Sequence, residues 1–71
     1  MKRRRTCYLL LRGMKTGRYL VIAKMLAVSV VEARDRFSTS TIWESGDEVL
    51  PLIQATLKLR KEAQKIHYIQ G

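Results

Sequence analysis

The side chains of this chain that could do chemistry are mostly cations. Its 71 residues include 14 Lys or Arg against 6 Asp or Glu, for a net charge of +8. Residues 1–31 hold eight Lys or Arg and no acid, whereas residues 32–71 hold six of each. A surplus of this kind attracts polyanions, so DNA, RNA or an anionic membrane surface are the natural partners.

Other reactive groups are too few to form a catalytic centre. Cys7 and His67 are the only cysteine and histidine. One of each gives neither a disulfide framework nor a Cys/His metal set. The sequence also has no nucleophile–base spacing and no glycine-rich phosphate loop. We expect no enzymatic activity, no cofactor, no metal and no small-molecule substrate. A lone thiol is typical of the reducing cytoplasm, where we expect the protein.

The apolar run over residues 19–31 is the only candidate for a membrane or targeting segment. It is 13 residues long and contains Lys24, whereas a spanning helix needs about 20 apolar residues. We therefore expect no membrane partner and no targeting segment.

The stretch over residues 19–37 predicts a helix, a tight bend and a second helix. No Gly, Pro or Asn interrupts residues 18–37, and a single strand rarely exceeds about ten residues. Ala23 is small enough for two helices to cross there, and Leu26 is a suitable apolar anchor before the bend. Ser29 is predicted to cap the second helix.

The pattern Ile-Ala-x-x-Leu-Ala-Val-Ser-x-x-Glu-Ala-Arg over residues 22–34 resembles the helix-turn-helix of small bacterial transcription regulators. The similarity is to fimbrial switch regulators of the Pap and Fae type and to phage repressors of the Cro type. The resemblance implies a transcriptional or phage-type regulator, such as a repressor, that inserts a recognition helix (about 29–37) into the major groove of double-stranded DNA.

The DNA-binding residues then fall into two groups. A basic arm, residues 1–5, and nearby cations are expected to bind phosphates. The recognition helix is expected to contact bases, with Arg34 reaching a guanine edge or a phosphate. The expected DNA-binding residues are Arg3, Arg4, Arg5, Arg18, Lys24, Ser29, Val30, Val31 and Arg34.

Residues 45–66 predict a C-terminal helix. Ser45 and Glu48 have the spacing of a capping box, and the lysines toward the end complement the helix dipole. Pro51 requires the helix to begin or to bend nearby. A wide apolar face on so short a chain suggests a homodimer, with Leu52, Ile53, Leu59 and Ile66 at its interface.

The leading expectation is therefore a mostly α single domain over residues 1–71, a small helix-turn-helix domain with a C-terminal helix. One alternative is a β-hairpin, with strands over 8–12 and 18–24, followed by helices in a basic RNA- or ribosome-associated protein. Another is a small adaptor or inhibitor that binds a protein through the apolar face of residues 49–66.

Overall fold

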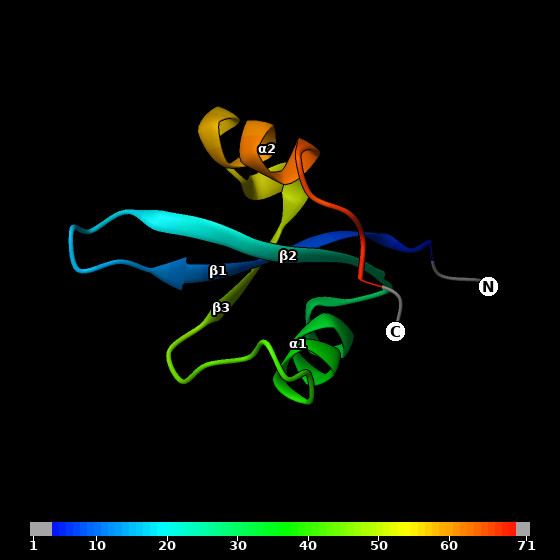
Figure 1. Ribbon diagram of the computed structural model, residues 1–71. Coiled ribbons are helices and arrows are strands. Elements are labelled where there is room, and N and C mark those ends of the chain that lie inside the picture. The colour runs from blue at the N-terminus through cyan, green and yellow to red at the C-terminus, as the bar shows by residue number, and fades with distance from the viewer. Residues whose placement is uncertain (1–3, 70–71) are drawn as a thin grey trace.

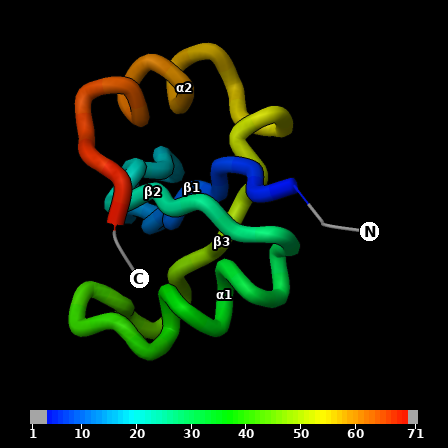
Figure 2. The backbone as a smooth tube through the Cα atoms, turned by 90° about the vertical axis from the view of Figure 1, so that its right-hand side faces the viewer, coloured from blue at the N-terminus to red at the C-terminus, as the bar shows by residue number. Residues whose placement is uncertain are grey.

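The computed structural model describes residues 4–69 as a three-stranded antiparallel sheet with a helix on each face (Figure 1). Figure 2 shows α2 and α1 on opposite sides of the strands. In chain order the elements are β1 (Thr6–Gly13), β2 (Tyr19–Ala27), α1 (Val30–Ser38), β3 (Glu48–Pro51), the 3-10 helix η1 (Leu52–Gln54) and α2 (Leu57–Gln64).

The mostly α prediction is wrong, because residues 19–27 form a strand rather than the first helix of a helix-turn-helix. β2 pairs along its length with β1, from Thr6 opposite Ala27 to Gly13 opposite Tyr19. Its β-branched and aromatic residues suit a strand. The pairing with β1 outweighs the helix propensity of the other residues in this segment. Strands therefore lie where the hairpin alternative placed them.

The β1–β2 turn is closed by two backbone hydrogen bonds. The Met14 N–H donates to the Arg18 carbonyl at 2.7 Å, and the Gly17 N–H donates to the Met14 carbonyl at 2.9 Å. Gly17 has a φ of 84°, a left-handed conformation that glycine adopts without steric cost. Farther along the hairpin, Leu10 pairs with Ala23 but Leu11 pairs with Val21, so Ile22 is an extra residue that forms a β-bulge.

α1 is the one part of the expected helix pair that is helical. The Glu32 N–H donates to Ser29 Oγ at 3.1 Å, so the predicted cap at Ser29 is confirmed. The chain thus enters α1 directly from the end of β2, through residues 28–29.

The predicted helix over residues 45–66 is wrong in its first half. Its residues form β3, η1 and only then α2, and the expected capping box at Ser45 caps no helix. Pro51 ends β3 and precedes η1 in an extended conformation, because its ring removes a donor and fixes φ. The N-cap of α2 is instead Thr56, whose hydroxyl accepts from the Leu59 N–H at 3.3 Å.

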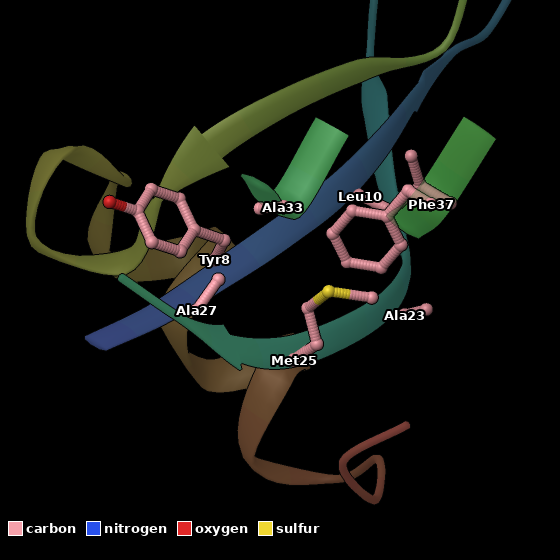
Figure 3. Close-up of a cluster of buried hydrophobic side chains, with 7 residues drawn as sticks. All are labelled: Tyr8, Leu10, Ala23, Met25, Ala27, Ala33 and Phe37. Atoms are coloured by element: carbon pink, nitrogen blue, oxygen red, sulfur yellow. The ribbon is translucent and has the colours of Figure 1, made fainter. Parts of the chain in front are cut away.

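Two apolar cores lie on opposite faces of β1, because its side chains alternate between the faces. On the α1 side, Phe37 and Leu10 are fully buried in a cluster with Met25 (Figure 3). On the α2 side, Leu9 and Leu11 pack with small or half-buried residues, namely Ala55, Ala63, Leu50, Leu52 and Leu59.

The segment after α2 returns to the sheet at β2. The Ile69 N–H donates to the Lys24 carbonyl at 2.8 Å, and Tyr68 forms a parallel bridge with Lys24. Within residues 4–69, no helix has the length and apolar character that crossing a membrane requires.

Candidate nucleic-acid interface

The charges of the described chain are divided between two parts of the fold. The segment over residues 30–48, which comprises α1, the following loop and the first residue of β3, holds five acids and two Arg. The remaining described residues, 4–29 and 49–69, hold ten Lys or Arg and one acid, Glu62. The cations therefore lie directly before β1, on β1 and β2, in the β1–β2 turn, and on or directly after α2.

Much of the negative charge serves to anchor the loop after α1. Arg12 donates from Nε to Asp47 Oδ1 and from Nη2 to Asp47 Oδ2, both at 3.0 Å. It also donates to the Ile42 carbonyl at 2.8 Å and lies 3.0 Å from Glu44 Oε2. The hydrogen bond from Arg12 lowers the pKa of Asp47 below its ordinary value, although burial opposes this. The Arg12 side chain thereby stabilises the fold.

The expected recognition helix lies on the acid-bearing side. Val30 and Val31 are exposed in its first turn, and Arg34 is exposed. Arg34 lines one shallow pocket with Asp47 and Glu48, and a second with Asp35. The exposed carboxylates of Asp35 and Glu48 beside Arg34 oppose the approach of a phosphate backbone.

The opposite helix, α2, presents cations instead. Lys58, Lys61 and Lys65 are all exposed, and their spacing puts them along one side of the helix. Arg60 is also exposed but donates to the Leu52 carbonyl at 3.2 Å and to the Ile53 carbonyl at 2.6 Å. Three lysines of α2 therefore remain available to bind an anion.

The β1–β2 turn extends past both helices (Figure 1) and adds two further cations. Lys15 and Arg18 are exposed there. Tyr19, directly after Arg18, leaves 46% of its surface exposed. An exposed aromatic ring beside cations suits contact with both a base and a phosphate.

A cleft of about 200 Å³ opens between α2 and the strands. Lys24 Nζ lies 4.5 Å from the centre of the Tyr68 ring, in a cation–π contact. Burial raises the pKa of the Cys7 thiol, while the nearby Tyr68 hydroxyl and Lys24 ammonium lower it less strongly. The charge of Cys7 and, to a lesser extent, burial raise the pKa of the Tyr68 hydroxyl. The cleft is lined by Cys7, Lys24, Leu52, Arg60, Ala63, Gln64 and Tyr68.

The other expected DNA-binding residues are scattered. Arg4 and Arg5 are exposed before β1, and Arg3 lies outside the described residues. Lys24 is half-buried on β2, and Ser29 is used as the cap of α1. The structure thus does not bring these residues to one surface with Arg34.

The expected dimer residues do not share one helix face either. Leu52 and Leu59 pack against the sheet, Ile66 is half-buried, and Ile53 is 79% exposed. They belong to η1, to α2 and to the segment after α2. Homodimer formation therefore stays a prediction, because these four residues do not form one continuous apolar surface.

The sequence analysis does not single out Lys58, Lys61 and Lys65 as candidate binding residues, nor Tyr68. The helical spacing of the lysines is a usable signal, but it also fits a complement to the helix dipole. Tyr68 gave no such signal, because only the return of the chain to β2 brings it beside Cys7 and Lys24.

Comparisons of the chain with protein-family models, with curated proteins and with solved structures give no match.

Proposed function

We propose that the protein binds nucleic acid through a cationic surface formed by α2 and the β1–β2 turn. The observation that carries the proposal is the division of charge. Apart from Glu62, every acid of the described chain lies in the segment 30–48, so the β1–β2 turn carries no acid and α2 carries one. A surface that holds cations with few competing carboxylates is the electrostatic footprint of nucleic-acid binding.

The chemistry of the contacts follows from the side chains. The exposed lysines Lys58, Lys61 and Lys65 are flexible point charges that suit phosphate oxygens rather than base edges. Lys15 and Arg18 extend the cationic surface along the turn. Each neutralised phosphate releases counterions, so binding should weaken steeply with salt.

The test compares two double substitutions that remove the same charge. Lys58→Gln with Lys61→Gln neutralises the α2 surface, and Arg34→Gln with Arg36→Gln neutralises α1. We expect the α2 variant to bind a fluorescent oligonucleotide about tenfold more weakly at low salt, since two phosphate contacts are lost. The α1 variant should stay within about twofold of the original protein.

The salt dependence adds a second readout. The slope of log affinity against log salt should fall by about 1.8 with a DNA duplex and by about 1.4 with a single strand for the α2 variant, because each phosphate contact contributes about 0.9 or about 0.7. Equal losses in both variants would show binding through net charge alone. A larger loss in the α1 variant would return the interface to Arg34 and overturn the proposal.

A further inference from the structure

The cleft between α2 and the strands differs in chemistry from the cationic surface around it. Part of its lining is formed by apolar or weakly polar groups, from Cys7, Leu52 and Ala63. Four polar side chains complete the lining, namely those of Lys24, Arg60, Gln64 and Tyr68. The Arg60 guanidinium already donates to two backbone carbonyls. The cleft is therefore lined partly by apolar groups and partly by groups that can form hydrogen bonds.

This combination suits a planar ring more than a phosphate. A phosphate requires donors around all its oxygens, but the apolar part of the lining supplies none and the Arg60 guanidinium is already held by two backbone carbonyls. A nucleobase has apolar faces and polar edges, and a volume of about 200 Å³ is ample for one ring system. Bases present both faces and edges only when they are unpaired and unstacked.

We infer that the cleft lined by Cys7, Lys24 and Tyr68 receives an unpaired nucleobase, so the nucleic acid bound there is single-stranded. This inference rests on the proposed function, because the lysines of α2 would hold the backbone that carries the base. The Gln64 amide and the Tyr68 hydroxyl can each donate to and accept from the edge of a base. The Lys24 ammonium can donate to a base carbonyl or ring nitrogen.

The experiment compares a short single-stranded oligonucleotide, as RNA and as DNA, with the duplex that it forms with its complement. Binding is measured by fluorescence anisotropy with the full chain. We expect at least one single strand to bind about tenfold more tightly than its duplex, because seating one base contributes a factor of this order. The RNA and DNA arms identify which backbone supplies the base.

Two variants test the cleft itself. Gln64→Tyr, at an exposed position that lines the cleft, should block it and weaken single-strand binding about tenfold while duplex binding is unchanged. The matched control is Gln54→Tyr, since Gln54 is also exposed but does not line this cleft. Tyr68→Ala, which removes the ring that lines the cleft, should resemble Gln64→Tyr.

The outcomes separate the two proposals. Equal binding of single strand and duplex, or no effect of Gln64→Tyr and Tyr68→Ala, would overturn the base site and leave the cationic interface intact. No binding of any oligonucleotide at low salt would overturn both. Thermal unfolding of each variant distinguishes a blocked cleft from an unfolded chain.

Discussion

The two faces of the sheet are built in different ways. On the α1 side, Phe37 is fully buried and the loop after α1 is fixed by the Arg12–Asp47 pair. On the α2 side, the helix buries Ala63 and half-buries Leu59, and a cleft remains beneath it. On the α1 side, the helix thus contributes a large, fully buried side chain. On the α2 side, the helix leaves cations and a cavity accessible. The difference suggests that one face maintains the fold and the other is available for binding.

The largest expected effect comes from emptying the α1-side core. Phe37→Ala should lower the free energy of unfolding by about 4 kcal/mol, because it removes a fully buried ring and leaves a cavity. On the α2 side, Leu59→Ala should lower it by about 1–2 kcal/mol, since Leu59 is half-buried. Urea titration measures both values. Phe37→Leu serves as a milder variant if the alanine chain does not fold, and a smaller loss than for Leu59→Ala would contradict the comparison.

The next effect concerns the Arg12–Asp47 pair. Asp47→Asn should lower the free energy of unfolding by about 2 kcal/mol at neutral pH, because charge-assisted hydrogen bonds to a buried carboxylate are weakened.

The pH dependence of that difference has a defined sign. Because the folded-state pKa of Asp47 lies below its ordinary value, the ionised carboxylate contributes stability above about pH 4. That contribution is lost as the pH falls through the lowered folded-state pKa. The gap between the original protein and Asp47→Asn, followed by urea titration at several pH values, should therefore shrink in acid. A gap that grows in acid would contradict the assignment.

Local opening should also differ between the faces. We expect the amide hydrogens of α2 to exchange about tenfold faster than the buried amides of α1, because α2 is attached through fewer large buried side chains. Hydrogen exchange followed by NMR or mass spectrometry measures the difference. Binding of an oligonucleotide should slow the exchange of amide hydrogens in α2 more than in α1. Protection confined to α1 would reverse the roles of the faces.

The smallest effect is expected at the exposed valine of α1. Val31 is 74% exposed, so Val31→Ser should change the free energy of unfolding by no more than about 0.5 kcal/mol. Oligonucleotide binding should stay within about twofold, because α1 is outside the proposed interface. A large loss of affinity with an intact fold would identify α1 as a binding element after all.

Some features of the fold were accessible from the sequence because they depend on neighbouring residues. Ser29 caps α1 through the N–H of Glu32, three residues on, and a local contact of that kind leaves a recognisable pattern. The surplus of cations before residue 32 was equally visible. Pro51 already indicated that a continuous helix over residues 45–66 was strained, and the strand β3 ends there.

The features that the sequence did not reveal depend on distant pairing. β2 contains Ala, Lys, Met and Leu, which suit a helix as well as a strand, and its pairing with β1 decides between them. β3 has only four residues, too few for a clear alternation. The cleft assembles Cys7 and Tyr68 from near the two ends of the chain, and no spacing in the sequence predicts that contact.

The bulge in β2 determines the side of the molecule on which Tyr19 lies. Ala23 and Met25 face the α1-side core, and strict alternation would send residues 21 and 19 to that same face. The extra residue, Ile22, shifts the count by one, so Val21 packs with the α2-side core and Tyr19 pairs with Gly13 two positions farther on. A strand that kept Ile22 but had no bulge would place the ring of Tyr19 on the face that carries the carboxylates. The local distortion of the backbone at Ile22 therefore decides on which face of the sheet this aromatic ring lies.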